Sequence, residues 1–256
     1  MEILLEIEKL TKIFGGLVAI DNLDLNIHRG EIVGLIGPNG AGKSTLFNLI
    51  SGFLRSSSGR ILFDGKDITG FGPERTSAIG IVRSWQATTI FGHFDRTVLG
   101  NVMVASHLRD KTGFWQALFN TRRYRREGQK LEKEALRLLE FMGMLKHKDK
   151  IVMNLPAALQ RCLAIVNCLA THPRLVMLDE PIAGMSAEES RDLMHRISRL
   201  RNEGYTLLIV EHNVKMVMDF CDRIAVLNYG HKIADGPPQE VRQNREVISA
   251  YLGEEG

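Results

Sequence analysis

The sequence reads Gly-Pro-Asn-Gly-Ala-Gly-Lys-Ser-Thr over residues 37–45, directly after the apolar run Ile32–Ile36. This spacing, G-x-x-x-x-G-K-[ST], is typical of a turn between a strand and a helix whose backbone N–H groups face a polyphosphate. The glycines allow a close approach, the Lys43 ammonium can reach the terminal phosphates, and the Ser44 hydroxyl is a candidate Mg²⁺ ligand. A glycine-rich turn without a ligand is the alternative. The stretch predicts a P-loop that binds a nucleoside triphosphate through Gly37, Pro38, Asn39, Gly40, Ala41, Gly42, Lys43, Ser44 and Thr45.

The composition is that of an ordinary globular protein. The chain has 256 residues, 44% hydrophobic and 25% charged, enough for one large α/β domain or a domain with a subdomain. A net charge of +3 is too small to argue for nucleic acid as a partner. No stretch approaches the roughly 18 to 20 apolar residues of a membrane span, and the acidic start lacks the basic region of a signal peptide. We therefore expect a cytosolic protein whose work at a membrane would need a partner that supplies the span.

Cysteine usage gives no sign of a metal site or a disulfide framework. The three cysteines, Cys162, Cys168 and Cys221, form no C-x-x-C pair and have no histidine at metal-binding spacing. We expect them to be buried, reduced thiols.

Strand-like and helical patterns alternate along the chain. Strands are expected at 4–7, 19–27, 31–36, 60–64, 79–83, 175–178, 206–210 and 223–227. Helical patterns are expected at 44–51, across 97–170 and at 187–200. This order predicts an α/β fold: a P-loop ATPase core with a mostly parallel sheet, an N-terminal antiparallel β part and an inserted helical subdomain. We expect one domain over 1–256, with the nucleotide-binding core at 1–86 and 171–256 and the helical subdomain at 87–170.

Two adjacent carboxylates follow the apolar strand expected at 175–178. Asp179 is placed to hold Mg²⁺ through its water shell, as the second required element of a P-loop ATPase. Glu180, one residue later, can polarise the water that attacks the γ-phosphate. A surface turn would carry the same dipeptide, but the pairing with the P-loop favours the catalytic interpretation.

Two further polar residues come just after strand-like runs. His212 follows 206–210, so the strand delivers it to the carboxyl edge of the sheet, where ligands bind in open α/β folds. We expect it to contact the γ-phosphate; a structural histidine is the alternative. Gln86 follows 79–83, and its amide oxygen can complete the Mg²⁺ shell, although a single glutamine carries little information.

Taken together, these residues resemble the ATP-binding subunit of an ABC transporter. They match its Walker A, Q-loop, Walker B and H-loop motifs in the right order, and the resemblance covers essentially the whole chain. The branch that energises uptake of branched-chain amino acids is the most similar. The residues that carry this closer resemblance are 12–17 (Lys-Ile-Phe-Gly-Gly-Leu) with Ala19, 80–86 (Gly-Ile-Val-Arg-Ser-Trp-Gln), the long segment around 107–127, and the ending 250–254 (Ala-Tyr-Leu-Gly-Glu).

The resemblance implies a mechanism and a set of partners. Phe14 falls where the family stacks an aromatic ring on adenine, a core-facing phenylalanine being the alternative. Two such ABC ATPase domains close head-to-tail around two ATP molecules with Mg²⁺, and hydrolysis reopens them. The implied partners are a second ABC ATPase subunit, integral-membrane permease subunits and, indirectly, an extracytoplasmic solute-binding protein, with this chain peripheral on the cytoplasmic face of the membrane. Candidate permease contacts, which could instead be subdomain core, are Thr88, Ile90, Phe91 and Phe94.

The chain departs from the family at the signature motif, usually Leu-Ser-Gly-Gly-Gln followed by Gln-Arg. The matching residues, 155–161, read Leu-Pro-Ala-Ala-Leu-Gln-Arg. Ala158 puts a methyl group where the backbone should approach phosphate, and would cost about 1 kcal/mol if the position needs a positive φ. Leu159 replaces an amide with an apolar group. ATP binding should therefore be normal, while closure of a homodimer and hydrolysis should be weakened.

Three functions remain open at this point. The first is a transport ATPase that energises import of branched-chain or similar amino acids. The second is a weakly hydrolysing, regulatory half of a heterodimer, which the altered signature favours. The third, an ABC ATPase of DNA repair or translation, is disfavoured because those proteins carry long coiled coils or two fused cassettes.

Overall fold

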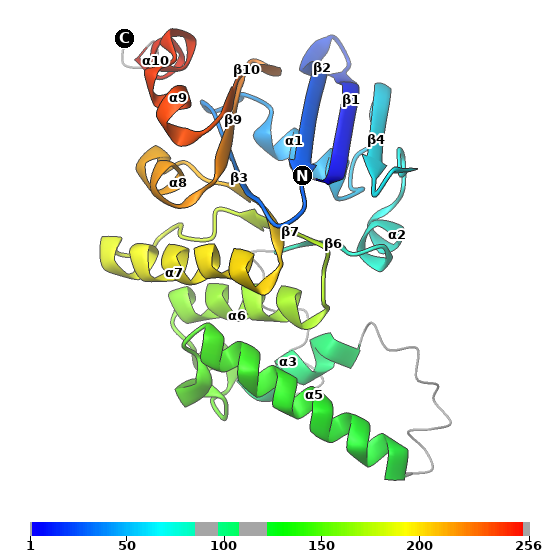
Figure 1. Cartoon of the computed structure of the whole chain (residues 1–256), viewed down its shortest axis with the longest axis vertical. Coiled ribbons are helices and arrows are strands. Elements are labelled where there is room, and N and C mark those ends of the chain that lie inside the picture. Colours follow the sequence, from blue (N-terminus) through cyan, green and yellow to red (C-terminus); the bar gives the residue numbers. More distant parts are fainter. Residues whose placement is uncertain (1, 85–96, 108–121, 253–256) are drawn as a thin grey trace. The chain divides into compact units, whose positions relative to one another are not determined.

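The computed structural model describes residues 2–84, 97–107 and 122–252 and divides the chain into two compact units (Figure 1). The first unit comprises Met1–Arg83, Arg174–Pro181 and Ile197–Gly256, and the second comprises Ser84–Pro173 and Ile182–Arg196. The sequence placed the second unit at 87–170 alone. The structure adds Ile182–Arg196 to it, and within this unit Arg196 donates a hydrogen bond to the backbone oxygen of Phe141 at 3.4 Å.

The first unit is built on a six-stranded sheet in the order β10-β9-β3-β8-β7-β6. Neighbouring strands run parallel, except that β10 pairs antiparallel with β9 at the edge. Every residue of β3 and β8 is buried, as expected for strands covered on both faces. The strands are β3 (Ile32–Ile36), β6 (Ile81–Arg83), β7 (Leu175–Asp179), β8 (Thr206–Val210), β9 (Arg223–Asn228) and β10 (His231–Gly236). The expected mostly parallel sheet is confirmed.

An antiparallel sheet in the order β2-β1-β4-β5 completes the β structure of this unit. It contains β1 (Ile3–Phe14), β2 (Leu17–His28), β4 (Ser58–Phe63) and β5 (Lys66–Asp67). Strand β1 continues well past the segment 4–7 that the sequence predicted. A register shift between Ile7 and Leu10, where Lys9 has a φ of +46°, breaks the alternation of apolar residues. The bulge therefore hides the second half of the strand from a pattern search.

One apolar core lies inside the first unit. Helix α1 (Lys43–Ile50) starts at the end of the P-loop and contributes Leu46, Phe47, Leu49 and Ile50. Both sheets contribute most of the remaining buried side chains, among them Leu5, Ile27, Leu35, Met177 and Leu208. This core fixes the P-loop and the carboxyl ends of the strands in one rigid frame.

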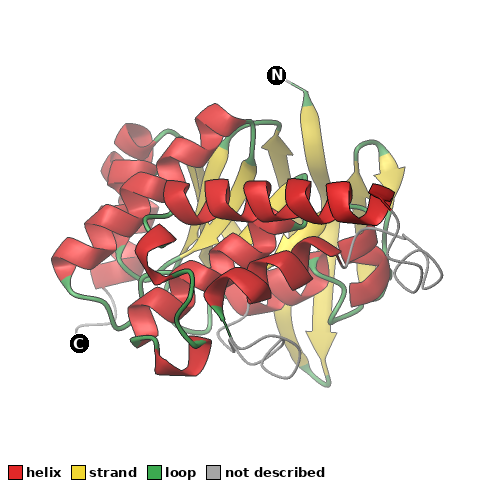
Figure 2. Cartoon of the chain, turned by 90° about the horizontal axis from the view of Figure 1, so that it is seen from below, coloured by secondary structure: helices red, strands yellow, loops and turns green. Residues whose placement is uncertain are grey.

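The second unit is helical in the parts that the structure describes. Helices α3 (Val98–His107), α5 (Arg122–Phe141) and α6 (Ala157–Ala170) pack on one another. One side of α5 is buried, with Ala135, Leu138, Leu139 and, just beyond the helix, Met142 in the apolar core of this unit. Helix α7 (Ala187–Arg199) belongs to this unit up to and including Arg196, and its last three residues are assigned to the first unit. Within the described residues, the strands (yellow in Figure 2) all have residue ranges that fall in the first unit, which agrees with an inserted helical part.

Short elements complete the fold. They are α2 (Pro73–Ala78), α8 (Val214–Phe220), α9 (Pro238–Gln243), α10 (Arg245–Leu252) and the 3₁₀ turns Leu145–His147, Val152–Asn154 and Leu200–Glu203. The sequence missed β10, because this edge strand is mostly polar and only half-buried. None of the helices in 2–84, 97–107 and 122–252 has the length and apolar character that crossing a bilayer requires.

An ion-pair network holds the β9–β10 hairpin. Arg223 donates to both carboxylate oxygens of Asp235, at 2.7 and 2.9 Å, and to the backbone oxygen of Asn26 at 2.8 Å. Lys232 adds a bond to Asp235 at 2.6 Å. Burial would raise the pKa of Asp235, but the hydrogen bonds from Arg223 and Lys232 outweigh it and hold this pKa below its usual value.

Replacing Asp235 with Asn should lower the free energy of unfolding at pH 7 by about 2 kcal/mol, because Arg223 and Lys232 lose a charged acceptor. The pKa of Asp235 is depressed in the folded state, so its contribution is complete above the unfolded value of about 4 and is lost as pH falls through the lower folded value. Urea unfolding of both proteins at several pH values measures this. A difference in unfolding free energy between the two proteins that stays constant down to pH 2.5 would contradict this prediction.

Candidate functional site

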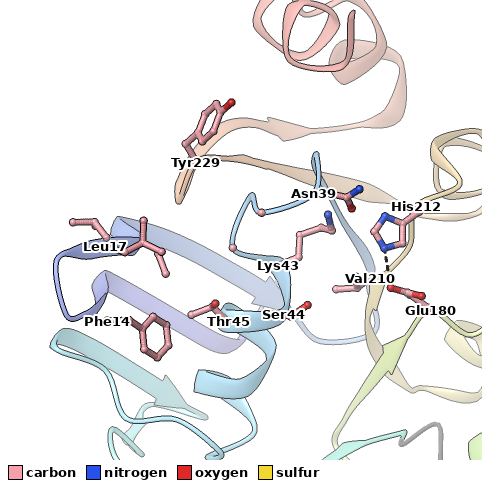
Figure 3. A pocket seen from close by; sticks show the side chains of 14 residues that line it. Phe14, Leu17, Asn39, Lys43, Ser44, Thr45, Glu180, Val210, His212 and Tyr229 are labelled. Atoms are coloured by element: carbon pink, nitrogen blue, oxygen red, sulfur yellow. Dashed lines mark hydrogen bonds and ion pairs between the residues drawn. The ribbon is translucent and has the colours of Figure 1, made fainter. Parts of the chain in front are cut away.

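A pocket of about 450 Å³ opens in the first unit, beside the P-loop. Figure 3 shows its lining, with Lys43, Ser44 and Thr45 at the centre and Glu180 and His212 at one side. Phe14, Leu17 and Tyr229 lie at the other side. The lining residues are Phe14, Leu17, Val18, Ala19, Asn39, Gly40, Gly42, Lys43, Ser44, Thr45, Glu180, Val210, His212 and Tyr229.

The P-loop is shaped by glycines that no other residue could replace. Gly37 has a φ of +153°, and a Cβ there would lie 2.1 Å from the backbone oxygen of Leu227. Gly42 has a φ of +102° and a Cβ there would lie 2.6 Å from the oxygen of Ala19. Gly42 is also the N-cap of α1 and supplies no side-chain cap, so the backbone at the helix N-terminus is open to a ligand in the pocket.

Lys43 is buried within the loop that it is expected to serve. Its ammonium donates hydrogen bonds to the backbone oxygens of Gly37 at 2.5 Å and Pro38 at 2.8 Å. These carbonyls hold a charged group that would otherwise be costly to bury. The lysine is thereby kept inside the P-loop, where a polyphosphate could take over part of its coordination.

The two-residue turn between β9 and β10 is fastened to the P-loop. Gly230 donates its N–H to the oxygen of Ala41 at 3.0 Å and accepts a bond from the N–H of Asp21, also at 3.0 Å. Tyr229 and Gly230 both have positive φ, which is the conformation of a type I′ hairpin turn. Tyr229 is 81% exposed and faces the pocket. The sequence did not single it out; its only signal was an aromatic residue before a turn glycine.

Glu180 and His212 meet at the ends of neighbouring strands β7 and β8. A hydrogen bond of 2.7 Å joins His212 Nε2 and Glu180 Oε1, drawn as the dashed line in Figure 3. Glu180 has a φ of +47°, an uncommon conformation for a non-glycine residue, and its N–H bonds to the oxygen of Val210 at 2.9 Å. The backbone therefore holds this carboxylate at the pocket in a strained geometry, a feature common at functional sites.

Asp179 has a partner that the sequence did not reveal. Its carboxylate pairs with the guanidinium of Arg83 at 2.5 Å, across strands β7 and β6. It is half-buried and is not among the residues that line the pocket. Asp179, the expected metal ligand, thus lies at the end of β7 as predicted, but its carboxylate is paired with Arg83.

Phe14 lies in the pocket lining and is 43% exposed, so it does not face the core. The Lys12 ammonium lies 4.8 Å from the centre of its ring. Gln86 lies outside the described residues, as do the candidate permease contacts Thr88, Ile90, Phe91 and Phe94.

Two family models match the chain. Residues 20–183 match the model described as ABC transporter. The chain belongs to the ABC transporter family. Residues 231–256 also match the model described as branched-chain amino acid ATP-binding cassette transporter.

Curated and solved ABC proteins resemble the chain over nearly its full length. The high-affinity branched-chain amino acid transport ATP-binding protein LivG of Escherichia coli (strain K12) is 40% identical over 252 residues, 98% of each chain. BraF of Pseudomonas aeruginosa, with the same description, is 39% identical over 252 residues, also 98% of each. The crystal structure of the ADP conformation of MJ1267, an ATP-binding cassette of an ABC transporter, has a TM-score of 0.83 at 29% identity and covers 99% of this chain and 100% of that one.

The ABC signature region lies in the second unit, at the start of α6. Pro156 is the N-cap of this helix and Ala157 its first residue. Ala158 lies in the first helical turn and is not among the described residues with positive φ, so the left-handed strain considered for this position does not arise. The methyl group therefore matters only through the space it fills. Ala157 is exposed, and Ala158 and Leu159 are half-buried.

The three cysteines are unpaired with one another, as expected. Cys168 and Cys221 are buried, whereas Cys162 on α6 is half-buried. Burial raises the pKa of Cys162 to about 11 and those of Cys168 and Cys221 to about 12. None of the three is therefore an activated thiol.

Proposed function

We propose that this chain is the ATP-binding and ATP-hydrolysing subunit of a membrane transporter that imports branched-chain amino acids. The observation that carries the proposal is the joining of the P-loop and the Glu180–His212 pair in one pocket. The solute class is supported by the match of residues 231–256 and by the printed functions of LivG and BraF.

The phosphates of ATP would lie at the N-terminus of α1. There the backbone N–H groups and the helix dipole favour negative charge. The Lys43 ammonium, now held by the carbonyls of Gly37 and Pro38, would turn toward the terminal phosphates. Phe14 would stack on the adenine, since its exposed ring is at the end of the pocket away from Glu180.

The three residues proposed to hold Mg²⁺ all carry oxygen donors, and of these Ser44 lines the pocket. Ser44, Asp179 and Gln86 would hold the ion with hydroxyl, carboxylate and amide oxygens, the ligands that Mg²⁺ prefers. Within the described residues no group of three or more His, Cys, Asp or Glu side chains could hold a metal by itself. When bound, Mg²⁺ neutralises charge on the β- and γ-phosphates.

Glu180 is the group best placed to activate water. Its carboxylate lines the pocket and is oriented by the hydrogen bond to His212 Nε2. Glu180 would accept a proton from the attacking water. His212 would contact the γ-phosphate and would also keep the Glu180 carboxylate oriented. The two roles need both side chains at one place, which is what the adjacent strands β7 and β8 provide.

A second ABC ATPase subunit, integral-membrane permease subunits and, indirectly, a solute-binding protein outside the membrane would complete the transporter. We propose that the chain is peripheral on the cytoplasmic face of the membrane. The altered signature, Pro156 to Leu159, favours one variation on this function. The chain could serve as the nucleotide-binding, weakly hydrolysing half of a heterodimer whose other subunit supplies an ordinary signature.

Reconstitution tests the transport function directly. The chain, its candidate partner ATPase and the permease subunits in proteoliposomes, with the solute-binding protein outside, should accumulate radiolabelled leucine when ATP is enclosed. Leucine uptake should stop when the Lys43→Ala variant is used in place of the wild-type chain, because the phosphate site loses its cation. Transport of another solute class under the same conditions, with no leucine uptake, would contradict the assigned substrate.

A further inference from the structure

Arg83 is a charged, largely buried residue of the first unit to which the proposed mechanism gives no role. It is the last residue of β6, and its side chain is only 9% exposed. The guanidinium donates to Asp179 Oδ2 at 2.5 Å and to Asn48 Oδ1 at 2.6 Å, and lies 5.5 Å from the centre of the Phe47 ring. It therefore connects three elements of this unit: β6, β7 and α1.

The position of α1 makes this contact significant. Lys43 and Ser44 begin the same helix that carries Phe47 and Asn48. Arg83 thus joins the helix of the phosphate site to the carboxylate at the end of β7. The guanidinium places a positive charge directly beside Asp179. A cation of the protein itself therefore lies against the carboxylate that is proposed to serve a divalent metal ion.

We propose that Arg83 is a positioning residue that acts as the resident counter-cation of Asp179 and thereby sets how much divalent metal the nucleotide site requires. The inference rests on the proposed role of Asp179 in the Mg²⁺ site. The pair places a positive charge directly against a half-buried carboxylate. When metal and nucleotide bind, Arg83 shares Asp179 with a second positive charge, and the repulsion weakens metal binding.

We expect the charge of residue 83, more than its shape, to determine how much metal the site requires. Arg83→Met keeps an unbranched apolar stem beside Phe47 but removes the charge, and Arg83→Gln keeps a hydrogen-bond donor without it. Both should lower the Mn²⁺ concentration for half-maximal binding in the presence of ATP on the order of tenfold. Arg83→Lys keeps the charge and should remain near the wild type. Asn48→Ala, the matched control, removes one acceptor from the guanidinium and should also leave the metal requirement near wild type.

Electron paramagnetic resonance of free Mn²⁺ measures the metal requirement without turnover, on the full chain with ATP equimolar to the protein and with the same ATP alone as the reference. Fluorescent ATP binding in EDTA should be the same for all variants, because the P-loop is unchanged. Weaker or unchanged Mn²⁺ binding in the neutral variants would overturn the proposal, as would Arg83→Lys behaving like Arg83→Met. If Arg83→Met does not fold, Arg83→Gln decides. Asp179→Asn separates the two proposals: if it leaves Mn²⁺ binding unchanged, the metal role of Asp179 fails, whatever Arg83 does.

Discussion

Glu180→Gln should lower ATP turnover by about a thousandfold and leave ATP binding unchanged. The amide is nearly isosteric with the carboxylate and can still bond with His212, so the geometry at the end of β7 survives. It cannot accept a proton from water, so the chemical step stops. Gln keeps the size and the hydrogen-bonding groups of the side chain at the pocket, which is why ATP binding should be spared.

Single-turnover hydrolysis and equilibrium ATP binding, measured on the same preparations with a partner ATPase present, separate the two effects. Glu188→Gln is the matched control, because it makes the same chemical change at an exposed residue of α7. The ATP turnover of His212→Ala should lie between those of Glu180→Gln and the wild type. This substitution removes the hydrogen bond that orients the Glu180 carboxylate but leaves the carboxylate in place. Turnover in Glu180→Gln within a few-fold of the wild type would show that another group activates the water.

Restoring the signature should raise the turnover of the isolated chain at least about tenfold. The double substitution Ala158→Gly with Leu159→Gln removes the methyl group and returns the amide that the family usually carries. Because Ala158 already has helical φ, the gain would come from space and hydrogen bonding to the partner's γ-phosphate, not from backbone relief. Ala164→Gly, further along the same helix, is the control. It shows how turnover responds to the loss of stability that a glycine causes in a helix, about 1 kcal/mol.

The dependence of rate on protein concentration shows whether two copies close. A rate that rises with the square of concentration in the double variant, and hardly at all in the wild type, supports a signature defect. Should the wild-type chain alone turn over at roughly 1 s⁻¹ with that same dependence, the interpretation as a weakly hydrolysing half would be excluded. The transport function would then need no second kind of ATPase subunit.

The sequence was sufficient wherever the chemistry is local. The P-loop could be placed because its glycines, Lys43 and Ser44 are consecutive, and Gly37 and Gly42 do have the positive φ and close contacts that the motif implies. The central strands could be placed because their burial on both faces leaves continuous apolar runs. Strand β1 was predicted only in part, because the bulge at Lys9 interrupts the alternation on which the prediction depended.

Pairings between distant residues depend on strand order, which the sequence does not state. His212 meets Glu180 because β8 pairs with β7, and Arg83 meets Asp179 because β6 pairs with β7 on its other side. Both contacts lie at strand ends, where functional residues were expected, yet the choice of partner follows from the sheet topology alone. Tyr229 was missed for the same reason: its hairpin reaches the P-loop only through the pairing of β9 with β3.

The bond between Gly230 and Ala41 has a consequence for biosynthesis. Chains emerge from the ribosome N-terminus first, so the P-loop is exposed long before the β9–β10 turn that supports its backbone has been made. ATP therefore has no complete binding site on the nascent polypeptide until almost all of this chain has been translated. The ligand can stabilise only the nearly finished protein, because His212 and Tyr229 of its pocket are made late.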